Sequence, residues 1–142
     1  MMKYRKSNNQ ILIRIDKGEE ILQTVLEICE IEQVFGAVFS GIGACGKATV
    51  SSFIPEKKDF INHTAEGMLE LISLNGNISK ENDKAFEHTH AMFSYLDGDV
   101  QKILAGHLKS AVVSYTAEIL LTVTEAIEKK FDPDIGITVW DI

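Results

Sequence analysis

FEHTHAMFSYLDGDVQKILAGH, residues 86–107, predicts a β-hairpin that carries histidines on both strands. Its centre is the dipeptide Asp97-Gly98, and Asp-Gly between two β-prone runs is one of the strongest short-range hairpin signals. If Asp97 and Gly98 are the two loop residues, His88 on the first strand lies directly opposite His107 on the second. The register of the two strands decides which of their side chains lie next to each other.

Three histidines converge in this hairpin. His88 and His90 are two residues apart, and side chains at that spacing share one face of a strand. Opposed residues have Cβ atoms about 4.5–5.5 Å apart, which places His107 beside His88 and diagonal to His90. Phe86 and Met92 share the face and would wall the site. Three neutral imidazoles are typical of a zinc or other divalent transition-metal site with an open coordination position.

The metal hypothesis has a simpler alternative, in which the histidines are half-buried, hydrogen-bonded and structural. A three-residue turn or a bulge would move His107 to the opposite face and remove the site. Gly106 is expected to let another backbone or a ligand come close. Glu118 lies among β-prone apolar residues and is either a catalytic or ligating carboxylate or a solvent-facing side chain. His63 is expected to be exposed.

The N-terminal part predicts a strand followed by a helix. Residues 11–15 alternate apolar and polar side chains, as a half-buried strand does. Asp16 is a candidate N-cap, with Glu19 three residues on, a spacing that resembles a capping box. Apolar residues then fall at helical spacing and form one stripe, which ends at Cys29.

A glycine-rich stretch follows the helix. It contains Gly41, Gly43 and Gly46 and separates two predicted strands, residues 34–40 and 48–54. The GxxxxGK[ST] spacing of a phosphate-binding loop is missing, and no helical pattern follows. The glycines are therefore interpreted as a tight turn or bulge between strands.

The remaining segments are mostly β-prone. Residues 55–67 predict a loop or weak edge strand, residues 68–79 a strand with a bulge at Asn75-Gly76, and residues 80–84 a charged turn. Residues 111–124 predict a long strand, residues 129–136 a loop, and residues 137–142 a last strand that closes the sheet. The long strand should present one apolar face, made of Val113, Tyr115, Ala117, Ile119, Leu121 and Val123.

Bulk composition narrows the function classes. The chain has 142 residues, 45% hydrophobic and 25% charged, which fits one globular domain spanning residues 1–142. Its net charge of −7 disfavours binding to nucleic acid. No apolar run reaches the ~20 residues of a membrane helix, and the polar start is not a signal peptide. Two isolated cysteines build no disulfide framework, so a cytoplasmic location is expected.

The chain contains the segments ILIRIDKGEEILQTVLEICE, SGIGACGKATV, LELISLNGNIS, HTHAMFS, AGHL and YTAEI. Together these segments resemble the plant-and-prokaryote conserved domain, or PPC domain. The resemblance covers nearly the whole chain, and its most specific elements are the HxH and GHL motifs with GIG upstream. Bacterial and archaeal members resemble this chain in being the domain alone.

The resemblance implies an α+β fold with a mixed, mainly antiparallel β-sheet and one or two flanking helices. It implies assembly as a homotrimer and a metal, zinc above all, held by His88, His90 and His107. The fold is similar to that of acetolactate decarboxylase. Relatives are often labelled predicted DNA-binding proteins, a label that the acidic charge argues against here.

Two functional hypotheses stand at this point, and no motif decides between an enzyme and a non-enzyme. The first is a trimeric metalloprotein whose open three-histidine site acts on a small metabolite. The alternative is a non-catalytic regulatory or assembly module in which the histidines are structural. DNA binding is a weaker third hypothesis.

Overall fold

The computed structural model describes residues 3–142 and contains one helix and eight strands within that range. Their bounds are β1 Lys3–Ser7, β2 Gln10–Asp16, α1 Ile21–Glu32, β3 Ala37–Ile54, β4 Asp59–Glu81, β5 Lys84–Asp97, β6 Val100–Val123, β7 Lys129–Asp132 and β8 Ile137–Trp140. The mainly antiparallel sheet and the single helix agree with the expected sheet and its one or two flanking helices, but the class is mainly β and not α+β.

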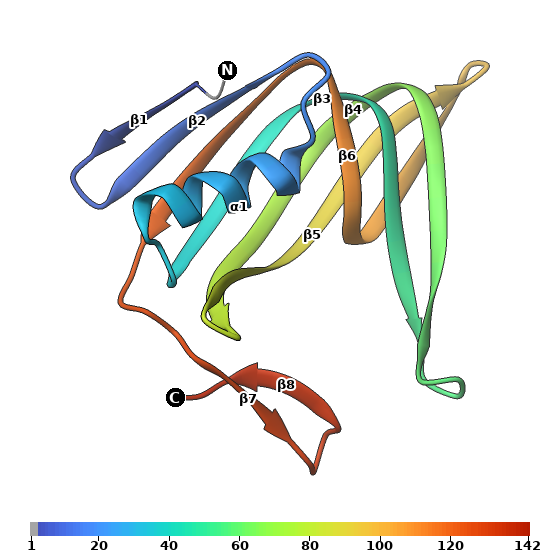
Figure 1. Ribbon diagram of the computed structural model, residues 1–142. Helices are drawn as coiled ribbons and strands as arrows, with labels where there is room; N and C mark the ends of the chain where they lie inside the picture. Colours follow the sequence, from blue (N-terminus) through green and yellow to red (C-terminus); the bar gives the residue numbers. More distant parts are fainter. Residues whose placement is uncertain (1–2) are drawn as a thin grey trace.

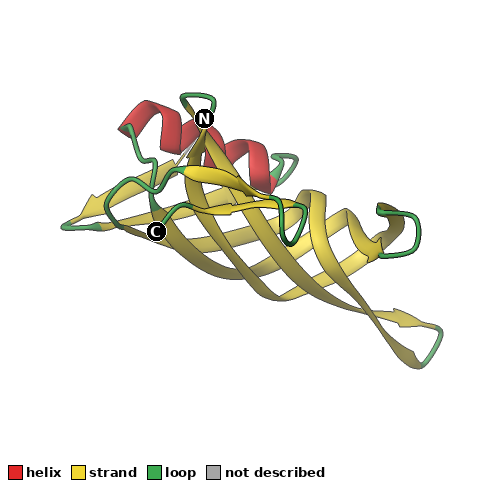
Figure 2. Cartoon of the chain, turned by 90° about the horizontal axis from the view of Figure 1, so that it is seen from below, coloured by secondary structure: helices red, strands yellow, loops and turns green. Residues whose placement is uncertain are grey.

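Six strands form one antiparallel sheet in the order β1-β2-β6-β3-β4-β5. The long strand β6 pairs with β3 along most of its length, and its first residues also pair with β5. This extra pairing closes β3, β4, β5 and β6 on themselves, so that the sheet curls around one side of the molecule (Figure 1). Figure 2 shows α1 lying across the curved strands.

The glycine-rich stretch lies inside β3 as a site of bulges. Register shifts occur between Gly41 and Gly43 and between Cys45 and Lys47, which confirms a bulge but not two separate strands. A Cβ atom on Gly43 would lie 2.4 Å from the carbonyl oxygen of Thr116. Glycine at this position therefore allows β3 and β6 to approach each other while the sheet bends.

The helix starts later than the capping-box pattern predicts. Its N-cap is Glu20, whose carboxylate accepts a hydrogen bond of 2.7 Å from the backbone N–H of Gln23. Asp16 stays in β2, and its N–H donates to the Glu19 carboxylate at 2.7 Å. The predicted cap is wrong, because Asp16 and Glu19 interact with each other at the end of β2, and Asp16 does not cap the helix. The helix ends at Gln33, which has a left-handed conformation.

The core lies between α1 and the concave face of the sheet. It contains the predicted helical stripe, including Cys29, and the inward side chains of the long strands. The predicted apolar face of residues 113–123 is buried except at Val123, which is partly buried, and at Tyr115, which is 72% exposed. Tyr115 breaks the alternation because the register between β3 and β6 shifts between Gly43 and Cys45.

Two other segments differ from their sequence-based assignments, and a third agrees with one of its two alternatives. Residues 59–67 belong to β4 and pair only with β3, which agrees with the edge-strand alternative and not with a loop. The β4 bulge lies between Leu71 and Ser73 instead of at Asn75-Gly76. Residues 100–107 and 111–123, assigned as separate strands, form the single strand β6. Within residues 3–142, no helix is long and apolar enough to cross a bilayer.

The C-terminal residues form a separate hairpin. Strands β7 and β8 pair only with each other, so the prediction that residues 137–142 close the main sheet is wrong. The hairpin is fastened to the end of β4, where the N–H of Lys80 donates to the carbonyl of Ile127 at 2.7 Å. The ammonium of Lys80 also lies 3.3 Å from the carboxylate of Glu128. This attachment brings β7 close to the start of β5 (Figure 1).

Candidate metal site

Three histidines meet on the outer face of the curled sheet. His88 and His90 belong to β5 and His107 to β6. Thr89 and Ala91 between and beside them are buried, as the alternation of a strand requires. One ligand atom from each imidazole lies within 4.8 Å of the other two.

The register of the β5–β6 hairpin differs from the predicted one by two residues. Asp97 pairs with Val100, so the loop residues are Gly98 and Asp99, and His107 pairs with His90 instead of His88. Gly98 has a φ of 62°, and glycine with positive φ at the first loop position matches a type II′ turn. The predicted partner was wrong, but a shift of two residues preserves the face of every side chain.

The spacing of the imidazoles fits a tetrahedral ion. With Zn–N bonds of about 2.0–2.1 Å, two ligand nitrogens stand ~3.3 Å apart. His90 Nε2 and His107 Nδ1 are 3.1 Å apart. The ring of His88 stacks on that of His107, with centroids 5.5 Å apart and an interplanar angle of 13°. The ligand nitrogen of His88 lies within 4.8 Å of those of His90 and His107.

The electrostatic environment favours the neutral form of His88 and of His107. Burial lowers the pKa of His88, and His90 and Lys129 lower it further. Burial likewise lowers the pKa of His107, with added repulsion from His90, His88 and Lys109. Neutral imidazole is the form that binds a metal, so protons compete weakly at these two positions.

Aromatic rings and lysines surround the histidines. Phe60 meets His107 edge-on, with ring centroids 5.2 Å apart. The ammonium of Lys109 lies 4.8 Å from the centroid of the same Phe60 ring, and that of Lys129 lies 4.1 Å from the centroid of Phe86. Phe60 and Lys129 could not be identified from the sequence. Phe60 lies in a segment predicted as a loop or weak edge strand and Lys129 in a predicted loop, where no pattern indicates which side chains meet a distant strand.

Gly106 allows β3 to lie against β6 next to the site. A Cβ atom there would be 2.6 Å from the carbonyl oxygen of Ser51, which confirms the expected close approach of another backbone. Ser51 is the register partner of His107 on β3, and its buried hydroxyl has no hydrogen-bond partner. The backbone around His107 is therefore held on both sides, by β3 and by β5.

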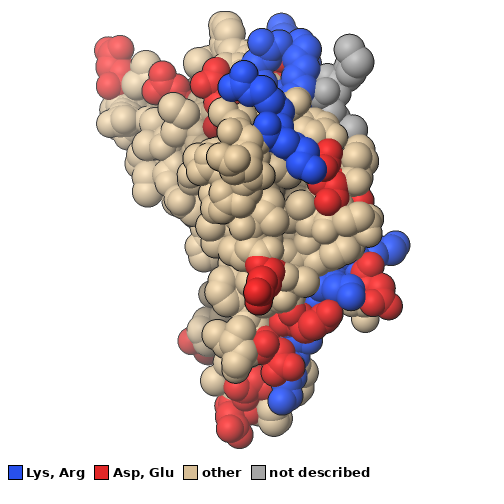
Figure 3. Space-filling model, turned by 90° about the vertical axis from the view of Figure 1, so that its left-hand side faces the viewer, with Lys and Arg blue, Asp and Glu red and all other residues tan. Residues whose placement is uncertain are grey.

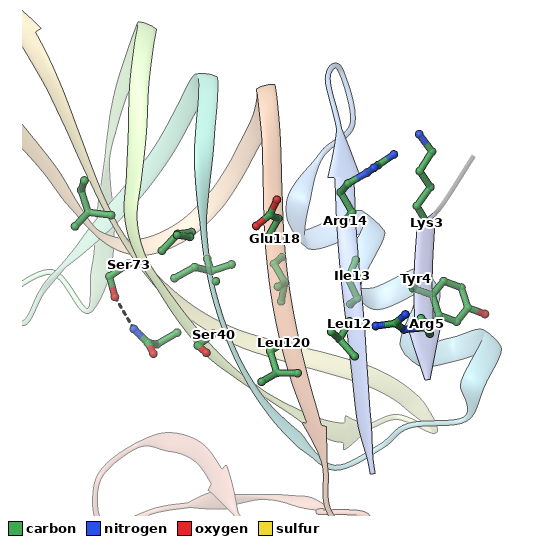
Figure 4. Close-up of a pocket in the computed structure, with 16 residues that line it drawn as sticks. Lys3, Tyr4, Arg5, Leu12, Ile13, Arg14, Ser40, Ser73, Glu118 and Leu120 are labelled. Carbon is green, nitrogen blue, oxygen red and sulfur yellow. Dashed lines mark hydrogen bonds between the residues drawn. The ribbon is translucent and has the colours of Figure 1, made fainter. Parts of the chain in front are cut away.

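The structure does not bring Glu118 to the histidines. Glu118 is exposed, is the register partner of Arg14, and lines a groove of about 950 Å³ on the outer face (Figure 4). It lies on β6 11 residues after His107, which corresponds to about 35 Å along the strand. His63 is exposed, as expected, and lies 3.4 Å from the hydroxyl of Ser52.

Glu87 is next to His88 in sequence but lies on the opposite face of β5, facing α1. Its carboxylate accepts a hydrogen bond from the hydroxyl of Thr89, and burial raises its pKa. Among residues 3–142, the cluster that can hold an ion consists of the three histidines without a carboxylate or thiolate. Both cysteines, Cys29 and Cys45, are buried free thiols.

Comparison with known families gives one match that covers most of the chain. The model of the Plants and Prokaryotes Conserved (PCC) domain, the family that the sequence motifs indicate, matches residues 2–125. No curated protein matches the chain in sequence.

Solved structures extend the match to the full length. A presumed DNA-binding protein from Bacteroides thetaiotaomicron is 30% identical, with a TM-score of 0.90 over 99% of this chain and 97% of its own. A metal-containing protein from Archaeoglobus fulgidus is 29% identical, with a TM-score of 0.82 over 100% of this chain and 99% of its own.

A more distant similarity concerns the fold alone. Acetolactate decarboxylase from Bacillus subtilis is 13% identical, with a TM-score of 0.56 over 81% of this chain and 53% of its own. The expected likeness of fold is thereby confirmed.

Proposed function

Because the chain belongs to the Plants and Prokaryotes Conserved domain family, we propose that it binds one divalent transition-metal ion through His88, His90 and His107. The observation that carries the proposal is the convergence of one ring nitrogen from each of three imidazoles within 4.8 Å. Zinc is the first choice, since it accepts a three-histidine set and the small separation of the nitrogens suits its tetrahedral geometry. The metal-containing relative from Archaeoglobus fulgidus supports the proposal.

The reaction class that fits such a site is a lyase or hydrolase reaction on a small metabolite. When bound by three histidines, zinc supplies a Lewis acid with an open coordination position. The chain's own residues hold and shield that position. Phe60 packs against His107 and limits access of water from that side. The pairing of β6 with β3 and with β5 fixes the backbone of His107.

The test is the metal content of untagged protein by elemental analysis. We expect about one zinc ion per chain in the wild type and its loss in His90→Ala and His107→Ala. His63→Ala is the matched control, because His63 is exposed and lies outside the cluster. Its metal content should equal that of the wild type.

The opposite result selects the alternative function. If the wild-type protein holds no metal after incubation with zinc, iron, nickel and manganese, the histidines are structural. The protein would then be a non-catalytic regulatory or assembly module, and the hydrogen bond between His90 and His107 would be the role of that pair.

Assembly as a homotrimer is part of the proposal. Large apolar side chains are exposed on the outer face around the groove of Figure 4, and such patches favour burial against another subunit. They include Leu12, Ile42, Ile72 and Leu120. Light scattering should give three times the chain mass of 15.8 kDa, and a monomer at micromolar concentration would contradict the trimer.

DNA binding, presumed for the Bacteroides relative, is not proposed for this chain. Figure 3 shows one group of Lys and Arg side chains at the top of the displayed face, a mixture of basic and acidic side chains at its lower end, and a largely uncharged surface between them. At the N-terminal strands, Lys3 and Arg14 are both paired with Asp16. This pairing and the net charge of −7 leave a small cationic patch, too weak for phosphate-driven binding.

A further inference from the structure

Two lysines lie beside the three-histidine cluster, one on each side of it. Lys109 follows His107 on β6, and its ammonium stands over the ring of Phe60, which itself contacts His107. Lys129 comes from β7 and stands over the ring of Phe86, two residues before His88 on the same face of β5.

These ammonium groups are available to a ligand. In the described part of the chain, neither Lys109 nor Lys129 has a carboxylate within 4.0 Å, whereas Lys3, Lys6, Lys47, Lys80 and Lys130 each have one. A cation held over an aromatic face keeps hydrogen-bond donors free for a further partner. Both lysines therefore stand at the site with unused donors.

The charge of the site favours an anion. The histidine cluster contains no carboxylate, so a bound divalent ion would keep its full charge of +2. Lys109 and Lys129 add two positive charges, and the single carboxylate of Glu87, on the other face of β5, interacts with both ammonium groups. The chain as a whole has a net charge of −7, so the positive charge of this site is a local property that does not follow from the overall composition.

The walls of the site are apolar and suit an organic ligand. Phe60 on β4 and Phe86 and Met92 on β5 are 43%, 38% and 40% exposed, so about half of each side chain is open to a bound molecule. Phe53 extends the wall behind Phe60, with ring centroids 5.2 Å apart. Such surfaces bind hydrocarbon better than they bind inorganic phosphate, which seeks donors on all sides.

We infer that the open position of the metal site binds an organic carboxylate, with Lys109 and Lys129 as its charge partners and Phe60 and Phe86 as the walls for its apolar part. The inference rests on the metal binding proposed above. It gives a role to the C-terminal hairpin, since Lys129 lies on β7, beyond the residues that the family model matches.

The experiment is isothermal titration of the zinc-loaded protein with benzoate, with neutral benzamide and with inorganic phosphate. Variants Lys109→Met and Lys129→Met remove one charge each. The matched controls are Lys102→Met on β6 and Lys130→Met on β7, both exposed lysines outside the site. Metal content is measured for every protein, so that carboxylate binding and metal binding are scored separately.

We expect benzoate to bind at least tenfold more tightly than benzamide or phosphate. Lys109→Met and Lys129→Met should each weaken benzoate binding about fivefold, as expected for one half-exposed ion pair, with metal content unchanged. The control variants should bind benzoate as the wild type does. A ligand contact at the site predicts this pattern, whereas a purely structural role of the lysines does not.

Two results would overturn the inference, and only the second would also overturn the proposed metal site. If the protein holds its metal but benzoate binds no better than benzamide or phosphate, or binds unchanged in both lysine variants, the carboxylate inference alone fails. If the wild-type protein takes up no metal, the proposed metal site fails and the inference fails with it.

Discussion

His90 and His107 form the last pair of the β5–β6 ladder, with Nε2 and Nδ1 3.1 Å apart. Beyond His90, β5 continues to pair with β4 but no longer with β6. His88 lies on this continuation, where it pairs with Asn77 of β4. An ion bound by all three histidines would therefore fasten β5 to β6 where the two strands separate.

Metal removal should lower the thermal stability of the protein. An ion that binds only the folded state, at a hundred times its Kd, stabilises it by ~2.7 kcal/mol. For a domain of this size, that corresponds to a fall in Tm of about 5–10 °C when the ion is removed. The measurement is scanning calorimetry with and without a chelator. His63→Ala should show the same fall, and His90→Ala should show none.

An equal Tm with and without chelator, in protein that elemental analysis shows to be loaded, would contradict this prediction. It would mean that the junction of β5 and β6 is already fixed by backbone pairing. The long ladder between β3 and β6 would then account for the order of His107.

The metal-free protein should lose stability as pH falls below about 6.5. The pKa values of His88 and His107 are lowered in the folded state, mainly by burial. Between the folded and unfolded pKa values, the unfolded chain binds more protons, so a falling pH favours unfolding. Urea unfolding of the chelated protein at pH 7.5 and 5.5 measures the difference.

The matched variant for this experiment is His88→Ala/His107→Ala, which removes both groups with lowered pKa. Its change in stability between the two pH values should be smaller than that of the wild type. Equal changes in the two proteins would assign the pH dependence to other groups.

DNA binding should be absent even at low ionic strength, where electrostatic attraction is strongest. The net charge of −7 repels phosphate, and Asp16 neutralises part of the cationic patch of Lys3 and Arg14. A mobility-shift assay with duplex DNA at ~20 mM salt, where counterion screening is weak, tests this. A shift that weakens on adding salt, and that the charge reversal Arg14→Glu abolishes, would restore the DNA-binding hypothesis.

The face of the histidine site was predictable from sequence, but its register was not. Two-residue periodicity fixes which side chains share a face, and any even shift of the hairpin preserves it. The exact pairing depends on whether Asp97 or Gly98 is the first loop residue. Gly98 takes that position because it adopts a positive φ at no steric cost. That choice is local, and the Asp-Gly signal alone permits both.

Some features could not be predicted from the sequence, because they depend on contacts between strands that are far apart along the chain. The exposure of Tyr115 follows from a register shift between β3 and β6, which no pattern within residues 111–124 reveals. Likewise, Lys129 reaches the site only because Lys80 holds the C-terminal segment. Glu20 displaced Asp16 as the helix cap, although both residue positions carry acids that can accept a backbone hydrogen bond.

The two cysteines should be inert in the folded protein. Burial raises the pKa of the Cys29 thiol to about 12 and that of Cys45 to about 11, so little thiolate forms below pH 9. A thiol reagent such as DTNB at pH 8 should therefore label neither residue in native protein. Both should react in urea. Rapid labelling of native protein would show that the core opens around α1 or β3 on the time scale of the assay.

Gly106→Ala should destabilise the fold and weaken the metal site together. The added Cβ would lie 2.6 Å from the carbonyl oxygen of Ser51, so β3 and β6 must separate at the position of His107. Overpacking of this kind costs about 1–3 kcal/mol of unfolding free energy. Urea unfolding of the metal-free protein measures that cost, and metal content measures the displacement of His107.

Gly46→Ala is the matched control for this substitution. A Cβ atom on Gly46 would have its nearest contact at 3.6 Å, with Cβ of Ser114, so the change should cost little. If Gly106→Ala were as stable as Gly46→Ala and kept its metal, β3 would yield at Ser51 without moving His107. The position of His107 would then depend on its pairing with His90 alone, and its support by β3 would be refuted.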